Sequence, residues 1–449
     1  MCVGQGRPAG GGGLTIRAPA GVADLQHDPG ASATVSRTFE SLSFHNYRIW
    51  FVAALVANTG TWMQRVAQDW LVLRILTDDS ASATGITTAL QFLPVLLLSA
   101  HAGVVADRVD QRRFLMLTQS AMGVVSAVLA IDVMTGTVQL WHVYAAALLS
   151  GVASAYDSPA RQIFVARMVP PDSLANAVGL NSASFNAARL LGPAAAGVVI
   201  AWVGPGAVFA VNALTFLFPT LALVLMRVDQ LRPIARAHRA KGQVREGLAY
   251  VRHRPDLVII IAVICVISML TLNFQVLMAA MVRSAFDLES EAYGTISSIF
   301  AVGSLGGSLL AARRDSPRVR TVLAAALALG VATLVMALMP TYWLFAAATI
   351  PVGLCTITLL TAANQTIQLT TEATMRGRVM SIFIMFFLGA TPVGAPLMGW
   401  VSDAWGPRCA LVIGGLTAIC APMLAGALAR RAWGVNLTPS ATLPHPPGG

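Results

Sequence analysis

Charged and polar side chains inside long apolar stretches are the first candidates for chemistry in this sequence. Arg65 and Asp69 are four residues apart, so a helix places them on one face, where they can pair. Gln64 and Gln68 form an adjoining stripe with the same spacing. Charges inside an apolar helix are costly and mark the paths of substrates and ions. The stripe therefore lines a polar path, or Arg65 and Asp69 form a structural bridge near the helix end.

Arg189 is a second candidate, because the apolar stretch around it contains no acidic residue. Its partner must come from another helix, from a substrate or from water, so we expect it to line a cavity. A purely structural bond between helices is the alternative. Trp62 lies away from the ends of its stretch, where tryptophans of membrane helices normally collect, and we expect it to wall the same cavity.

Three polar residues of a later stretch, Asn364, Gln365 and Gln368, could give hydrogen bonds to a substrate or to neighbouring helices. Asp69 is the one carboxylate that we expect well inside an apolar stretch, although toward its end. It can exchange a proton during a working cycle only if Arg65 turns away from it. Arg189 cannot exchange a proton, because arginine stays protonated in proteins.

The elements that position these residues follow from the composition of the chain. Of its 449 residues, 56% are hydrophobic and only 11% are charged, against about 25% charged residues in soluble proteins. Twelve apolar runs are each close to the roughly 20 residues that cross a bilayer as a helix. They span residues 49–76, 84–105, 114–134, 140–156, 174–201, 206–226, 257–282, 292–312, 321–339, 342–365, 379–402 and 409–429.

The basic residues predict the orientation of these helices, because Lys and Arg collect in cytoplasmic loops. Most of the 30 basic residues fall on one side of the predicted membrane, together with both termini, and only Arg74, Arg283 and Arg408 fall in loops on the other side. The net charge of +10 is thus a topology signal and no sign of nucleic-acid binding. We expect a multi-pass protein of the inner (cytoplasmic) cell membrane with cytoplasmic N- and C-termini.

The predicted fold is an all-α integral membrane protein with twelve transmembrane helices in two six-helix halves. A weak internal repeat supports the halves, since an offset of 206 residues superposes Arg108 and Arg112 on Arg314 and Arg318. The expected parts are a disordered cytoplasmic tail, an N-terminal half, a basic linker, a C-terminal half and a second tail. They cover residues 1–42, 43–228, 229–255, 256–430 and 431–449. Residues 243–253 could form an amphipathic helix on the membrane surface or part of a solvated linker.

Several classes of enzyme site are missing from the sequence. A phosphate-binding P-loop needs a Gly-Lys pair, and the single lysine, Lys241, follows an alanine. The sequence contains neither an H-E-x-x-H nor a G-x-S-x-G motif, and its five cysteines form no C-x-x-C pair. We therefore expect no enzyme activity, no catalytic residues, no cofactor and no metal site, which leaves an ion gradient as the energy source.

The segment after the second predicted helix has the pattern G-x-x-x-D-R-x-x-x-R-R. It consists of Gly103, Asp107, Arg108, Arg112 and Arg113. This pattern resembles the signature loop of the major facilitator superfamily, except that Val109 and Asp110 replace an aromatic residue and a glycine. Segments 60–70, 157–162, 188–193 and 376–380 are similar to the branch that contains enterobactin exporters and related drug exporters. The resemblance covers nearly all of residues 43–430.

The fifth predicted helix resembles the antiporter motif of the same superfamily, G-x8-G-x3-G-P-x2-G-G. Gly179, Gly192, Pro193 and Gly197 match it, whereas alanines replace two other glycines. In that family the motif implies export rather than uptake. Ordinary helix packing is the alternative, because small residues at this spacing are common in membrane helices.

The resemblance also implies an inner gate, in which the loop after the second helix meets the eleventh when the protein faces outward. We expect Asp107 to pair there with the start of the eleventh helix, through its amides, Arg376 or Arg378. Asp107 lies at a helix C-terminus and the arginines at a helix N-terminus, where each charge opposes its own helix dipole.

The function that these features predict is secondary transport by alternating access. We expect a monomer in the lipid bilayer that exports a small amphipathic molecule in exchange for protons, as in multidrug efflux. The substrate could be a drug, a siderophore or a metabolite. A proton-coupled importer, or a membrane sensor that keeps the fold without transport, is the alternative. The polar residues of the first, fifth and tenth helices argue modestly against the sensor.

Overall fold

The computed structural model describes residues 39–232, 243–312, 319–372 and 375–433. From Ser41 onward the chain forms one compact unit. Most of the predicted N-terminal tail 1–42, the middle of the linker 229–255, the repeated arginines Arg314 and Arg318, and most of the tail 431–449 lie outside the described residues.

Every regular element in the described part of the chain is a helix. The first group consists of α2 (His45–Trp70), α3 (Ala81–Arg108), α4 (Gln111–Met134), α5 (Leu140–Met168), α6 (Leu174–Val203), α7 (Pro205–Thr215) and α8 (Leu217–Leu225). The second consists of α9 (Gln243–Arg252), α10 (Pro255–Leu270), α11 (Phe274–Ala280), α12 (Ser290–Ala312), α13 (Val319–Ala337), α14 (Tyr342–Thr370), α15 (Arg376–Gly389), α16 (Thr391–Trp405) and α17 (Pro407–Trp433). The all-helical prediction is confirmed.

Ten stretches of the described residues are long and apolar enough to cross a membrane. They match ten of the twelve predicted runs. The other two runs correspond to α2 and α5, which are equally long but less apolar because both carry charged residues. The prediction of twelve transmembrane helices therefore rests on counting these two helices as spans.

Four predicted runs have different boundaries in the structure. Run 206–226 is split at Phe216, run 257–282 at residues 271–273 and run 379–402 at Ala390. Pro219 and Pro392 lie in the first turns of α8 and α16, which explains two of the breaks, because proline cannot donate the bond that continues a helix. At the third, the Asn273 side chain donates to the Met269 carbonyl (2.7 Å). Run 140–156 is too short, since α5 continues to Met168.

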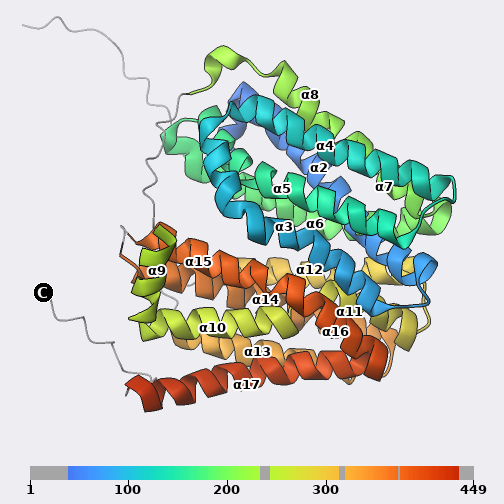
Figure 1. The fold of residues 1–449 in the computed structure, drawn as a ribbon, viewed down its shortest axis with the longest axis vertical. Helices are drawn as coiled ribbons and strands as arrows, with labels where there is room; N and C mark the ends of the chain where they lie inside the picture. The colour runs from blue at the N-terminus through green and yellow to red at the C-terminus, as the bar shows by residue number, and fades with distance from the viewer. Residues whose placement is uncertain (1–38, 233–242, 313–318, 373–374, 434–449) are drawn as a thin grey trace, which may run out of the picture. The chain divides into compact units, whose positions relative to one another are not determined.

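The two groups of helices repeat one packing order (Figure 1). In the first group, α3 and α4 both pack against α5, and α4 packs against α7. In the second group, α12 and α13 both pack against α14, and α13 packs against α17. Local backbone features repeat as well. Asp79 and Asp287 have φ near 59° and 52°, and the left-handed Gly204 and Gly406 each precede a proline that begins a helix.

Two helix crossings make most of the contacts between the groups, α3 on α16 and α6 on α12. Glycines allow the close approach in both. A Cβ on Gly197 of α6 would lie 3.1 Å from the Ser290 carbonyl oxygen and 3.4 Å from the Cα of Gly294. Gly399 of α16 packs in the same way against the backbone of Ala81 and Ser82 in α3. The first helix, α2, lies beside α6 and places the candidate residues next to the second of these crossings.

Candidate functional site

The structure brings together three of the predicted path residues, Trp62, Arg65 and Arg189. The guanidinium carbon of Arg65 lies 4.8 Å from the centroid of the Trp62 ring, and that of Arg189 lies 5.7 Å from it. Trp62 is only 9% exposed. Two cations from different helices therefore share one buried aromatic partner, which is a favourable cation–π arrangement for each.

Further aromatic rings complete this cluster. Phe92 of α3 lies 5.6 Å from the Arg65 guanidinium carbon, and Phe300 of α12 lies 5.3 Å from that of Arg189. Phe185 packs edge-on against Trp62 at 5.7 Å. Because Phe300 belongs to the second helix group, the cluster lies where the groups meet. None of these phenylalanines was predicted as a site residue, since an aromatic in an apolar stretch is unremarkable in sequence.

Asp69 makes its hydrogen bond to the other helix group and not to Arg65. The Tyr293 hydroxyl donates to Asp69 Oδ2 at 2.9 Å, and both residues are buried. Among the described residues no ion pair within 4.0 Å joins Asp69 to Arg65, although the two charges act on each other electrostatically. The bridge, one of the two roles expected for this pair, is therefore not formed in this structure, and the path role stays a prediction. The spacing did place both on α2. It could not reveal Tyr293, which lies 224 residues away.

Gln64 lies in a buried polar network within the first helix group. Its side-chain oxygen accepts hydrogen bonds from Ser126 Oγ (2.6 Å) and from the amide of Asn212. Ser126 also donates to the Phe209 carbonyl at 2.8 Å. These contacts join α2, α4 and α7, so Gln64 is hydrogen-bonded to side chains of two neighbouring helices. Gln68 is buried as well, and a path role for both glutamines stays a prediction.

A second buried carboxylate, Asp157, was not predicted inside a span, because the predicted run ended at residue 156. Asp157 is 3% exposed and accepts hydrogen bonds from Thr118 (2.8 Å) and Gln119 (2.7 Å) of α4. It also pairs with Arg161 one turn further along α5, at 2.6 Å. All these residues belong to the first helix group. The arrangement stabilises one group and does not connect the two.

The three polar residues of α14 lie apart from the arginine cluster. The Gln368 amide donates to Asn364 Oδ1 within the same helix, and Gln365 is partly exposed. Among the described residues no hydrogen bond or ring contact joins these three to Arg65 or Arg189. A role in contacting substrate stays a prediction for them.

The predicted inner-gate residues lie near the ends of several helices. Gly103 is buried in α3, whereas Arg108, Arg113 and Arg376 are exposed. Arg112 donates to the carbonyls of Leu223 (2.5 Å) and Val224 (3.2 Å) at the C-terminal end of α8. It thereby satisfies carbonyls that have no partner within the helix.

Arg378 has a different partner from the expected one. It pairs with Glu246 of α9 at 2.8 Å, and Gly247 of α9 packs against Ile382 of α15. Residues 243–252 are thus a helix docked on α15, rather than an isolated linker segment. A pairing of Asp107 with the start of the eleventh span, expected for the outward-facing form, stays a prediction.

The opposite ends of the helices carry bonds between the two groups. Asp403 of α16 accepts hydrogen bonds from the backbone amides of Ala81 (2.7 Å) and Ser82 (2.9 Å) at the start of α3. A carboxylate is favourable at a helix N-terminus. Arg283 pairs with Asp79 of the first group at 3.2 Å and with Asp287 at 2.5 Å. At this end the groups are therefore held together by charged contacts.

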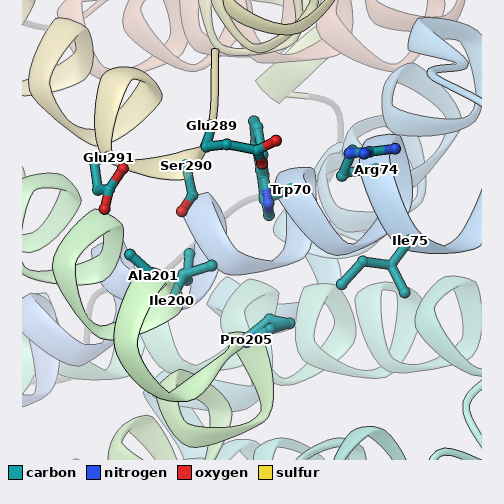
Figure 2. A pocket seen from close by; sticks show the side chains of 9 residues that line it. All are labelled: Trp70, Arg74, Ile75, Ile200, Ala201, Pro205, Glu289, Ser290 and Glu291. Carbon is teal, nitrogen blue, oxygen red and sulfur yellow. The ribbon is translucent and has the colours of Figure 1, made fainter. Parts of the chain in front are cut away.

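A pocket of about 390 Å³ lies close to the same end (Figure 2). Its side chains come from the end of α2 and the π-helical segment Leu71–Leu76 that continues it, from the α6–α7 junction and from the start of α12. They are Trp70, Arg74, Ile75, Ile200, Ala201, Pro205, Glu289, Ser290 and Glu291. Asp69 and Tyr293, which bond each other, are close in sequence to Trp70 and Ser290 of this lining. The pocket could not be predicted from the sequence, because three segments that are far apart in the chain contribute to it.

The antiporter-like residues of α6 face several neighbours. Gly192 packs against α2, where an added Cβ would lie 2.6 Å from the Cβ of Trp62, and Gly197 packs against α12. Pro193 is buried inside the helix, and nothing lies within 4 Å of a Cβ built on Gly179. Close packing accounts for Gly192 and Gly197, while a role in export stays a prediction.

Comparison with known proteins identifies the relatives of this chain. A family model described as transmembrane secretion effector matches residues 36–448. The staphyloferrin A transporter of Staphylococcus aureus is 25% identical and covers 84% of this chain and 94% of its own. The multidrug efflux pump Tap of Mycobacterium tuberculosis is 27% identical, with 88% and 96% covered. Macrolide efflux protein A of Streptococcus pyogenes is 20% identical, with 83% and 93% covered.

Solved structures share the fold at low sequence identity. A bacterial homologue of the human lysosomal transporter Spinster, inward-facing and occupied, matches with a TM-score of 0.66 and 14% identity over 85% of this chain and 96% of its own. A POT family transporter in complex with 5-aminolevulinic acid matches with a TM-score of 0.67 and 11% identity over 86% and 96%. Together with the family match, they lead to one conclusion: the chain belongs to the transmembrane secretion effector family and is a multi-pass membrane transporter of the major facilitator superfamily, not an enzyme.

Proposed function

We propose that this protein exports small amphipathic compounds from the cell in exchange for protons, by alternating access between two six-helix halves. It acts in the inner cell membrane with both termini in the cytoplasm. The repeated packing order of the two helix groups supports a division into two halves. Each half has six spans when α2 and α5 are counted with the ten apolar stretches. The relatives named for drug efflux support export, and they make a drug-like substrate the first to test.

One observation carries the coupling part of this proposal, the hydrogen bond between Asp69 and Tyr293. Asp69 is a buried carboxylate of the first group, and its partner is a hydroxyl of the second. A proton on Asp69 removes the negative charge that the tyrosine hydroxyl stabilises, and so weakens a bond between the halves. Proton binding at Asp69 can therefore favour one arrangement of the halves over the other.

The bonds made by Asp403 and Arg283 join the two groups at one end, and we interpret them as an outer gate in its closed state. The placement of this gate follows from the arginine-rich loops, which we assign to the cytoplasm. With the outer gate closed, the arginine cluster would open toward the cytoplasm. This is the state in which an exporter takes up its substrate.

Transport by inverted membrane vesicles tests the direction. In such vesicles the cytoplasmic face is outside, so an exporter accumulates substrate inside when the vesicle interior is made acidic. We expect a lipophilic dye without a basic group, which an acidic interior alone does not trap, to accumulate under an imposed pH gradient, and to leak out when the gradient is collapsed. Accumulation only in right-side-out vesicles would establish an importer, and no gradient-driven movement in either orientation would favour a sensor.

A further inference from the structure

Two arginine side chains at the meeting point of the helix groups form no ion pair with any described residue. Among the described residues, neither the Arg65 nor the Arg189 guanidinium makes a hydrogen bond or an ion pair within 4.0 Å. Arg65 Nε is buried without any partner. A guanidinium carries five N–H donors, and buried donors in folded proteins are nearly always satisfied.

The two charges also repel each other. Both guanidinium carbons lie within 6 Å of the Trp62 ring centroid, and each side chain is close enough to act on the other electrostatically. Asp69, one helical turn from Arg65, acts on it electrostatically, but it forms an ion pair with neither arginine and accepts a hydrogen bond from Tyr293. Two partly buried cations with one carboxylate near them leave one positive charge uncompensated, which a further anion placed between them would offset.

We propose that Arg65 and Arg189 together bind a carboxylate of the transported substrate, and that the apolar part of this substrate packs against Phe185 and Trp62. This inference rests on the proposed transport function and deepens it by naming the chemical class of the substrate. Planar guanidinium groups match a carboxylate with paired N–H donors, which is why arginine is favoured at such sites.

A cationic substrate fits this place less well. Aromatic rings can hold a cation, but here Trp62, Phe92 and Phe300 already lie against the protein's own arginines. A positively charged ligand would add a third cation to two that are unpaired. The site is also reachable, since both arginines keep part of their surface accessible and Phe185 is 46% exposed.

The site belongs to both helix groups, which ties binding to the transport cycle. Arg65 and Arg189 come from α2 and α6 of the first group, whereas Phe300 comes from α12 of the second. The Ser298 hydroxyl of α12 also donates to the Leu190 carbonyl of α6 at 2.9 Å, next to Arg189. A carboxylate that draws the Arg189 side chain toward Arg65 would pull it from Phe300, and so loosen a contact between the groups.

Binding of three related probes to the purified full-length protein in lipid nanodiscs tests this inference. The probes are the anionic 1-naphthoate, the neutral 1-naphthamide and the cationic 1-naphthylmethylammonium. The binding affinity of each is measured by calorimetry. We expect naphthoate to bind more tightly than either of the others. Arg65→Gln and Arg189→Gln should each weaken naphthoate binding about 10- to 100-fold, the usual value of a charged hydrogen-bonded contact, and leave naphthamide binding unchanged.

Two further variants control for folding and for general charge. Arg189→Lys keeps the charge but loses the planar fork, so it should weaken naphthoate binding by less than Arg189→Gln does. Arg48→Gln removes one positive charge from an exposed position on the same helix as Arg65, and naphthoate binding should stay as in the wild type. If the glutamine variants do not fold, the carboxylate site is still tested by the affinities of the wild type for the three probes and by the affinity of the lysine variant for naphthoate.

The possible results separate this inference from the proposed function. Equal binding of the three probes, tighter binding of the cation, or no binding of naphthoate would overturn the carboxylate site, even if a pH gradient drives transport of other compounds. Naphthoate binding that depends on both arginines, but without any gradient-driven transport, would support the site and contradict the proposed exporter.

Discussion

The Asp157 carboxylate holds three side chains of two helices in a buried position, and its loss should cost stability rather than transport. Asp157→Ala would leave Arg161 without its ion-pair partner and would remove the hydrogen bonds that Thr118 and Gln119 donate to the carboxylate. We expect a loss of about 3–5 kcal/mol, measured as a lower melting temperature in detergent. Transport per folded molecule should stay unchanged. A melting temperature equal to that of the wild type would contradict this role.

Asp132 offers the matched control for that measurement. It pairs with His142 at 2.5 Å near the other end of the same helices, but both side chains are partly exposed. Asp132→Ala should therefore cost no more than about 1 kcal/mol, as is usual for exposed pairs.

Single residues were predicted unevenly from the sequence. The rarity of charge in apolar stretches pointed to Arg65, Asp69 and Arg189, because the cost of such charges is independent of the fold. All three lie inside helices, with Asp69 buried and the two arginines partly buried. Their partners could not be predicted. Tyr293 and Phe300 are distant in sequence, and neither a tyrosine nor a phenylalanine stands out in a membrane helix.

At the scale of helices, the N-terminus of α3 depends on a carboxylate from α16. Asp403→Asn would weaken the hydrogen bonds to the amides of Ala81 and Ser82 and remove a charge that favours the helix N-terminus. We expect this end of the molecule to open more often. Ser290→Cys, introduced in the pocket of Figure 2 in a variant without its native cysteines, should then react faster with a membrane-impermeant maleimide.

Asp78 provides the control, since it is exposed and lies in the same loop as Asp79. Asp78→Asn should leave the labelling rate at position 290 unchanged. If the cysteine at position 290 is labelled no faster in the Asp403→Asn variant than in the Asp78→Asn variant, the Asp403 carboxylate is not part of a gate.

The crossing of α6 and α12 should tolerate no larger side chain at Gly197. A Cβ there would already approach the backbone of Ser290 and Glu291 to 3.1–3.2 Å, so Gly197→Leu must push the two helices apart. We expect the variant to fold but to transport at a small fraction of the wild-type rate, with the pocket of Figure 2 open to labelling. Val198→Leu, at an exposed position next to it, should transport normally. Normal transport by Gly197→Leu would show that close packing here is dispensable.

The sequence predicted most helices but not their interruptions. Hydropathy alone marks an apolar run, so the breaks at Phe216, Ala390 and residues 271–273 were invisible, as was the continuation of α5. Prolines in the first turn of a following helix are the signal that could have revealed two of these breaks.

For the whole molecule, three observations fit one transport cycle. The helix groups share a packing order, charged contacts hold them together at one end, and a carboxylate of one group bonds a hydroxyl of the other. The internal repeat was predicted from a few arginines, of which Arg314 and Arg318 lie outside the described residues. The repeated backbone conformations at Asp79 and Asp287 support it through features that no sequence pattern contains.

Transport by Asp69→Asn in proteoliposomes tests the central claim, that Asp69 couples the proton to substrate movement. Asparagine keeps the size of the side chain and can still accept from Tyr293, but it cannot exchange a proton. We expect the variant to bind substrate and to exchange labelled for unlabelled substrate across the membrane, yet to show no accumulation under an imposed pH gradient. Gradient-driven accumulation by Asp69→Asn at the wild-type rate would contradict the account.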